Sequence, residues 1–351
     1  MSNLKNITGA LLIDATATFL NGFGLKAQED KNEIIPKTFR MKVNNKFENV
    51  PYVSAQSWRR WLRDTCNEEN NWEPSEFEAV SFNTKGATNK VSNKLNPIDF
   101  PEDDIFGYMK AGGKEEDEEG KKVKSESLQR TTALKTSILK GIPNMYALTT
   151  DEGTVFPKNG TPLRYSTQFY STHLEGFFNL EYSRLGVYDN LGSHQELSKE
   201  LVENNSDKFE ITKIGNGKFN RYTLKDAATK RKAHASGLLK GLAYLRGGAK
   251  QAAFGADVAP KVLILAGMTS ANPVFNNLFI GTGEKPALNI DIIKQIAVDY
   301  KDKLSTPIHI GIRAGYLQNE EDVKSLVKVG FVIDSPIGIV NQFNKNYLKN
   351  E

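Results

Sequence analysis

The sequence predicts an α+β fold built on a ferredoxin-like βαββαβ core. Apolar runs of strand length alternate with amphipathic segments of helix length, as in mixed folds. Two long polar stretches interrupt this alternation, and no internal repeat is visible. With the polar stretches set aside, the remaining order is strand, helix, strands, helix, strand, which is the order of a βαββαβ core.

The first core elements are a strand and a helix. Residues 5–20 are rich in apolar and β-branched types and predict a buried strand, followed by a polar loop over residues 21–36. In the segment PYVSAQSWRRWLRD, Ser54 is a suitable N-cap for a helix of about three turns that ends near Asp64. The apolar residues at helical spacing there are Trp58, Trp61 and Leu62.

The two polar stretches are predicted to be insertions. Residues 68–130 are dominated by Asn, Lys, Gly and acidic residues, which indicates a large insertion with a mobile tip. Acidic residues are concentrated over residues 99–120, and we expect them to lie in a solvated loop. Residues 189–219 form a second, shorter insertion with Asn-Gly turn signals.

The second half of the chain completes the core. Aromatic and β-branched residues over 163–188 predict a strand or a pair of strands. A helix is expected over 225–245 and is stopped by Gly247 and Gly248. The remaining predicted elements are a buried strand in KVLILAGM, an amphipathic helix in DIIKQIAVDYKDK and short strands near 308–316.

Composition excludes several classes of protein. Hydrophobic residues make up 39% of the 351 residues, which is enough for a packed core. A single cysteine, Cys66, rules out an intramolecular disulfide and a cysteine-based zinc site. The N-terminus does not read as a signal peptide, and no apolar run is long enough for a membrane span, so we expect a cytoplasmic protein with no membrane partner.

The strongest signal of function is a concentration of positive charge. Ten basic residues stand between Lys213 and Lys250, where Asp226 is the one acid, while the net charge of the whole chain is only +4. Tyrosine and phenylalanine are interleaved with them. Such a stretch suits a single-stranded nucleic acid, although a lysine-rich solvated helix has the same composition.

Two local motifs could hold phosphate. Ser54 and Ser57 lie at a predicted helix N-terminus, where free N–H groups and the helix dipole favour anions, and Arg59 and Arg63 add charge one turn apart. In the second motif, Arg246-Gly247-Gly248-Ala249-Lys250, paired glycines allow close approach of the backbone to an anion. The alternatives are ordinary capping with surface arginines for the first motif and a plain helix stop for the second.

Catalytic motifs are weak. Gly22–Ala27 fits G-x-G-x-x-A, but no apolar helix follows, and no P-loop is present. His173 near Glu175 and His234 beside basic residues form no convincing catalytic set, and no metal or cofactor site is expected.

Five stretches together resemble a known family. They are ITGALLIDATATFLNG, PYVSAQSWRRWLR, DDIFGYM with RTTALKTSIL, PLRYSTQFYSTHLEGFF, and LLKGLAYLRGGAKQA. Their order resembles the RAMP superfamily, and within it the DevR-type Cas-seven family. Members of that family form the guide-RNA-binding backbone of type I CRISPR Cascade complexes, and subtype I-B is the expected subtype here.

The resemblance implies a hand-shaped, non-catalytic subunit. Its RRM-like palm would comprise residues 1–67, 136–187 and 226–351, with a finger insertion at 68–135 and a thumb insertion at 188–225. The residues expected to line the guide RNA are Ser54, Ser57, Arg59, Arg63, Arg246, Gly247, Gly248, Lys250 and Gln251. The implied partners are the guide RNA, target DNA paired with it, further copies packed head to tail, and other Cascade subunits.

Two alternatives remain open. A RAMP-type endoribonuclease that processes precursor CRISPR RNA would depend on a catalytic histidine or a Lys/Tyr set near the glycine-rich loop, and His234 lies on the preceding predicted helix, about three turns from that loop. A DNA-binding regulator would need a helix-turn-helix, and none is evident.

Overall fold

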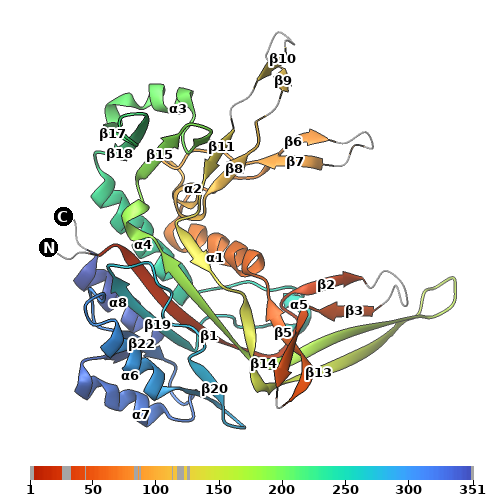
Figure 1. The fold of residues 1–351 in the computed structure, drawn as a ribbon. Helices are drawn as coiled ribbons and strands as arrows, with labels where there is room; N and C mark the ends of the chain where they lie inside the picture. The colour runs from red at the N-terminus through yellow and green to blue at the C-terminus, as the bar shows by residue number, and fades with distance from the viewer. Residues whose placement is uncertain are drawn as a thin grey trace. The chain divides into compact units, whose positions relative to one another are not determined.

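The computed structural model describes residues 4–25, 33–43, 45–82, 86, 88–112, 114–116, 122–124 and 127–348. The chain folds into two compact units that each combine helices and strands, so the predicted α+β class is confirmed (Figure 1). The first, here called the sheet unit, comprises residues 1–65, 136–179 and 239–347. The second unit comprises residues 66–135, 180–238 and 348–351.

One large mixed sheet organises the sheet unit. Its main path runs in the order β23 (Val332–Asp334), β22 (His309–Ile312), β19 (Val262–Met268), β1 (Asn6–Thr18), β14 (Leu163–Leu180), β13 (Leu139–Val155), β5 (Lys46–Val53) and β4 (Thr38–Val43). Off this path, β12 (Leu134–Thr136) and β3 (Glu33–Pro36) pair with β14, and β2 (Gly22–Leu25) pairs with β3. β1 is antiparallel to β19, and β13 is antiparallel to β14.

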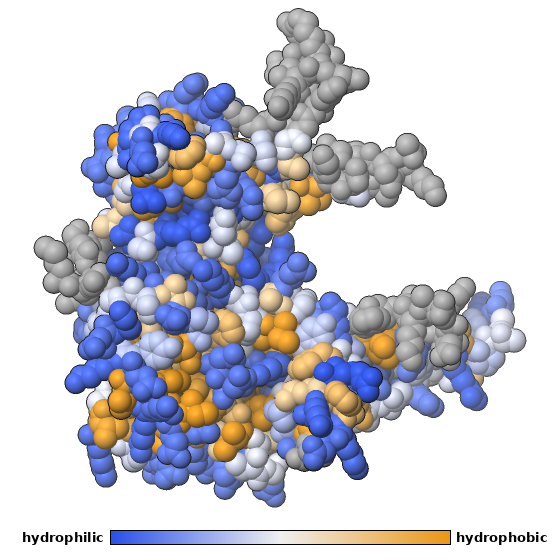
Figure 2. All heavy atoms as spheres, viewed as in Figure 1, coloured by the Kyte–Doolittle hydropathy of each residue, from blue (hydrophilic) through white to orange (hydrophobic). Residues whose placement is uncertain are grey.

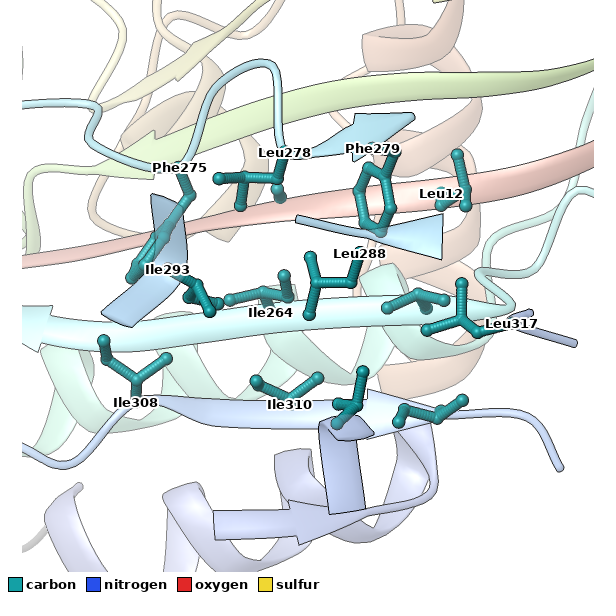
Figure 3. Close-up of a cluster of buried hydrophobic side chains, with 14 of the residues drawn as sticks. Leu12, Ile264, Phe275, Leu278, Phe279, Leu288, Ile293, Ile308, Ile310 and Leu317 are labelled. Atoms are coloured by element: carbon teal, nitrogen blue, oxygen red, sulfur yellow. The ribbon is translucent and has the colours of Figure 1, made fainter. Parts of the chain in front are cut away.

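The sheet is covered on both faces along β1 and β19, because successive side chains of these two strands are buried over most of their length. Leu12 on β1 and Ile264 on β19 join a hydrophobic cluster with Ile293 of α6 (Ile290–Asp299) and the hairpin of β20 (Phe279–Gly281) and β21 (Pro286–Leu288), as Figure 3 shows. Leu11 and Leu263 point to the opposite face and are also 0% exposed. Helices α5 (Gln251–Phe254), α7 (Glu320–Ser325) and α8 (Pro336–Tyr347) also belong to this unit.

The two long predicted helices are present with different ends. α1 spans Ala55–Asn70 and does not end near Asp64, because its buried face continues with Cys66, four residues after the buried Leu62. α4 spans Ala227–Ala243, so it ends before Gly247 and the two glycines are not its immediate stop. The loop predicted over residues 21–36 is wrong where β2 and β3 form.

The second unit contains a separate six-stranded sheet. Its order is β17 (Phe209–Ile214), β18 (Phe219–Leu224), β15 (Val187–Leu191), β16 (His194–Gln195), β11 (Leu128–Arg130) and β8 (Tyr108–Lys110). A small apolar cluster that includes Tyr188, Phe209 and Tyr222 packs beside this sheet. The other described elements are the hairpins β6 (Glu78–Phe82) with β7 (Thr88–Ser92) and β9 (Lys114–Glu116) with β10 (Lys122–Lys124), and the helices α2 (Pro101–Phe106) and α3 (Lys199–Asn204).

The acidic stretch is not a solvated loop over its first part. Glu102, Asp103 and Asp104 belong to α2 and are at most 1% exposed. Asn67 and the Ser75 amide donate to Glu102, and Asn93 donates to Asp103. Buried carboxylates are tolerated because each has donors, and most of those donors lie far away in the sequence. Residues 117–120 of the acidic tract lie outside the described residues.

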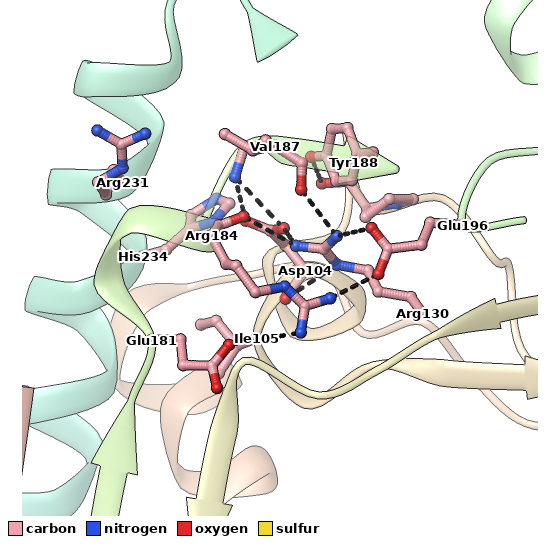
Figure 4. Close-up of polar contacts among 12 residues, drawn as sticks. Asp104, Ile105, Arg130, Glu181, Arg184, Val187, Tyr188, Glu196, Arg231 and His234 are labelled. Carbon is pink, nitrogen blue, oxygen red and sulfur yellow. Dashed lines mark hydrogen bonds and ion pairs between the residues drawn. The ribbon is translucent and has the colours of Figure 1, made fainter. Parts of the chain in front are cut away.

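A buried ionic network joins the strands of the second unit (Figure 4). The Arg130 guanidinium is fully buried and is paired with Asp104 and, at 3.1 Å, with Glu196. It also donates to the carbonyl oxygens of Asp104 and Val187 at 3.2 and 3.1 Å, and it lies 4.5 Å from the centre of the Tyr188 ring. Every nitrogen of the guanidinium therefore has a partner within this unit.

Hydrophobic side chains also reach the surface. Figure 2 shows such side chains over the part of the sheet unit that holds α6 and α7, and exposed residues there include Val298, Val327 and Val329. In the parts of the chain that are described, no helix combines the length and apolar character needed to cross a membrane.

Candidate nucleic-acid interface

The glycine-rich loop packs on Trp61 of α1 and on Leu20, which follows β1. A Cβ added at Gly247 would overlap the Trp61 side chain, and one added at Gly248 would overlap the side chains of Leu20 and Gln251. The Ala249 amide donates to the Leu20 carbonyl at 3.0 Å. Both glycines have positive φ, 144° and 111°, which disfavours any residue with a Cβ, and the Trp61 side chain also leaves no room for one at Gly247.

The N-terminus of α1 is organised by a polar cluster. Ser54 is the N-cap: its Oγ accepts from the Ser57 amide at 3.3 Å, and its carbonyl accepts from the Trp58 amide at 3.3 Å. The two serine hydroxyls lie 2.8 Å apart. Asn21, which follows β1, contacts both serines: its Oδ1 accepts from the Ser54 amide at 3.2 Å, and its Nδ2 donates to Ser57 Oγ at 3.0 Å.

These contacts bring the two predicted phosphate-binding motifs to one place. Leu20 touches the glycine-rich loop, and the next residue, Asn21, touches the α1 N-terminus. Trp61, one turn beyond Ser57, packs against Gly247. Residues 54–63 and 246–251 are therefore neighbours although they are far apart in the sequence.

Four cations belong to this region of the sheet unit. Arg59, Arg63 and Lys250 are half-buried, and Arg246 is exposed. Burial, followed by the nearby charge of Arg63, lowers the pKa of Arg59, but a guanidinium remains charged at neutral pH. Arg60, on the same helix, pairs with Asp64 at 2.9 Å. The two neighbouring stretches, 54–63 and 246–251, therefore contribute these four cations to the candidate interface.

Lys250 is held in an unusual backbone conformation. Its φ of 51° and ψ of 34° are left-handed, a region that a residue with a side chain seldom adopts. Its ammonium donates to Thr167 Oγ1 at 2.9 Å and lies 5.4 Å from the centre of the Phe19 ring. Gln251 turns inward and donates through Nε2 to the Gly247 carbonyl, so this amide stabilises the loop.

The predicted concentration of ten cations is divided between the two units. Lys240, Arg246 and Lys250 belong to the sheet unit, and the other seven belong to the second unit. Three of those seven already bond to groups within the second unit. Arg221 forms a bidentate ion pair with Asp189. Lys230 donates to the Ile98 carbonyl, and Arg231 donates to the Ser183 carbonyl.

Neither candidate histidine lies in an open catalytic arrangement. His234 is 3% exposed, and its Nδ1 lies 2.8 Å from Asp104 Oδ2. His173 is half-buried, with Nδ1 2.6 Å from the Tyr316 hydroxyl, and burial lowers its pKa despite the nearby charge of Asp14. Within the described ranges, no three His, Cys, Asp or Glu side chains gather in a way that could hold a metal ion.

Sequence reasoning missed the residues that join the two motifs. Asn21 was placed in a polar loop, Trp61 was regarded only as a core residue, and Thr167 was not singled out. A polar residue directly after a buried strand is a signal that could have identified Asn21. No pattern in the sequence around Thr167 indicates that it would accept a hydrogen bond from Lys250, because that contact depends on the pairing of distant strands.

The fold has relatives among solved structures. A chain from a structure described as a CRISPR RNA-guided surveillance complex, pre-nicking, is 11% identical and aligns over 97% of this chain and 99% of its own length, with a TM-score of 0.53. A chain from another CRISPR RNA-guided surveillance complex is 12% identical and aligns over 97% and 98%, with a TM-score of 0.49. The first likeness shows a shared fold. No family model matches the sequence, and no curated protein sequence matches it.

Proposed function

We propose that this chain is a non-catalytic, CRISPR RNA-binding backbone subunit of a type I surveillance complex. The observation that carries the proposal is the meeting of the α1 N-terminus and the glycine-rich loop at the end of β1. Helix N–H groups, hydroxyls and cations that converge in this way suit successive phosphates of one strand. The shared fold with a chain of a CRISPR RNA-guided surveillance complex supports the same reading.

The strand order supports an RRM-like palm. β1 lies between β14 and β19, and β13 lies outside β14. α1 stands in the chain between β1 and β13, and α4 stands between β14 and β19. This is the arrangement of a βαββαβ domain, in which each helix follows a strand across the sheet. The proposed finger, residues 68–135, and thumb, residues 188–225, both belong to the second unit.

The β13–β14 hairpin supports head-to-tail packing of copies along the guide. Its outer half, from Ala147 to Tyr165, is exposed on almost every residue of both strands. Phe156, Val155 and Leu163 are 77%, 51% and 53% exposed. A two-stranded ribbon is marginal by itself, so exposed apolar residues on one favour a partner. Exposed valines near α6 and α7 offer a different surface, as a heterologous, non-closing contact requires.

Several features support a role without catalysis. His234, the candidate histidine for a processing nuclease, is buried against Asp104 in the second unit. Sequence recognition would be delegated to pairing between guide and target DNA, so this chain needs only to hold the backbone of the guide. We propose no cofactor and no metal for this function.

One purification tests the proposal. The protein expressed with its genomic neighbours and a CRISPR array should copurify with RNA of one defined length, and the number of copies should grow with that length. RNA should stay intact during incubation with or without magnesium. Absence of bound RNA, or cleavage by the purified chain, would refute the proposal.

A further inference from the structure

Asn21 and its neighbour Leu20 connect three parts of the sheet unit. The Asn21 side chain bonds Ser54 and Ser57 at the start of α1, its own carbonyl accepts from the Lys37 amide at 2.9 Å, and Leu20 accepts from Ala249 in the glycine-rich loop. Asn21 is therefore fixed by its backbone while its amide reaches the helix.

The orientation of that amide is determined by its partners. A backbone N–H can only donate, so the Asn21 atom that faces the Ser54 amide must be the oxygen. The atom that faces Ser57 Oγ is then the nitrogen, which donates. No other assignment of the two Asn21 atoms satisfies both contacts.

This orientation leaves one hydroxyl proton unused. Ser57 Oγ accepts from Asn21, and Ser54 Oγ accepts from the Ser57 amide. The bond between the two hydroxyls uses one of their two protons, whichever serine donates it. The second proton has no partner among these contacts, so the pair presents a donor and prefers an oxygen anion over a cation or a donor.

We infer that Asn21 is a positioning residue for the guide RNA, and that it acts through the Ser54–Ser57 pair by keeping that pair a net donor. The inference rests on the proposed RNA-binding function and names a residue that the function did not include. Asn21 itself need not touch the RNA, because its two polar atoms are already engaged.

A double-mutant cycle tests the inference. Affinity for a guide-length RNA is measured by fluorescence anisotropy for Asn21→Ala, Ser57→Ala and the double variant. Asn21→Ala should weaken binding about five- to tenfold, as expected for one hydrogen bond to an anion. In the Ser57→Ala background the same change should have little further effect, because the residue through which Asn21 acts is already gone.

Two further variants separate positioning from simple stabilisation. Asn289 caps α6 in the same unit by accepting from the Ile292 amide, so Asn289→Ala is a matched control that should lower the melting temperature without changing RNA affinity. Asn21→Asp keeps the acceptor for the Ser54 amide, but its second oxygen must accept a proton from Ser57. The Asn21→Asp variant should stay folded but bind the guide-length RNA more weakly than wild type.

The outcomes are distinct. Wild-type affinity for Asn21→Ala, or equal losses in the wild-type and Ser57→Ala backgrounds, would overturn the inference while leaving the proposed function intact. A wild-type protein that binds no guide-length RNA would overturn the proposed function and this inference with it.

Discussion

At the scale of single residues, Lys250 carries a side chain in a backbone conformation that glycine adopts with less strain. The left-handed backbone region costs a residue with a Cβ about 1–2 kcal/mol, and Lys250 occupies it with a φ of 51°. The hydrogen bond from its ammonium to Thr167 offsets part of this unfavourable free energy. The strained backbone is better explained if the charge of Lys250 is needed for binding than if its side chain is needed for folding.

Lys250→Gly should therefore separate stability from binding. The variant relieves the backbone and loses the Thr167 bond, so its free energy of unfolding should stay within about 1 kcal/mol of wild type. RNA affinity should fall several-fold, and the slope of log affinity against log salt should shrink by about 0.7, which corresponds to one phosphate contact. Urea unfolding and anisotropy titrations at several salt concentrations measure the two effects.

Asn45→Gly is the matched control, because Asn45 also has positive φ in the sheet unit and is exposed. It should leave both the affinity and its salt slope unchanged. If Lys250→Gly binds with the affinity and salt slope of wild type, Lys250 does not contact the guide.

Cys66 offers a test of burial. Burial first, and then the nearby charge of Glu102, raise the pKa of its thiol well above the usual range. The thiolate is the reactive form, so the folded protein should react with a thiol reagent at pH 8 far more slowly than the chain in denaturant. Rapid labelling of the native protein would mean that α1 opens readily near Cys66.

At the scale of elements, hydrophobic periodicity predicted those strands and helices whose formation depends mainly on their own residues. β1, α1 and α4 were each predicted from their own residues, although two of the helix ends were displaced. The helical acids of α2 were not predicted, because their donors Asn67, Ser75 and Arg130 come from other segments and no window of sequence contains them all. Both candidate phosphate motifs were predicted singly, but their meeting depends on Asn21 and Trp61.

The Arg130 network should make the second unit sensitive to acid. Burial alone would raise the pKa of Asp104, but the charge of Arg130 and hydrogen bonds from His234 and Gly186 outweigh it and leave the pKa below its usual value. The pKa of Asp104 in the unfolded chain is about 3.9. Its ionised form therefore stabilises the fold at higher pH, and this contribution is lost as the pH falls from about 4 through the native value.

Asp104→Asn should lower the free energy of unfolding at pH 7 by about 3–5 kcal/mol, because it removes one of the two carboxylates that balance the buried Arg130 guanidinium and leaves only Glu196. The variant should also lose less stability than wild type between pH 5 and 3 in urea unfolding. Asp64→Asn breaks the exposed pair with Arg60 and should cost less than about 1 kcal/mol. Parallel pH profiles for wild type and Asp104→Asn would contradict the assignment.

At the scale of the whole molecule, the proposed binding should be electrostatic and nearly independent of base sequence. If roughly four to six cations meet phosphates, the slope of log affinity against log salt should be about −3 to −4 for single-stranded RNA. Mixed sequences of equal length should bind alike, since base edges are left for the target. A flat salt dependence, or a strong preference among such sequences, would contradict backbone recognition.

The hairpin makes a separate prediction about assembly. Phe156 is 77% exposed near the end of the β13–β14 ribbon, and a charge there would oppose burial against a second copy. Phe156→Glu should therefore bind an RNA short enough for one copy with wild-type affinity, yet lose cooperative coating of a long RNA.

Ile211→Glu, at a 54% exposed apolar position in the second unit, is the matched control and should coat normally. Analytical ultracentrifugation with RNAs of increasing length measures the number of copies bound. Cooperative coating by Phe156→Glu would place the contact between copies on another surface, whereas weakened binding to the short RNA would place the hairpin on the RNA of its own copy.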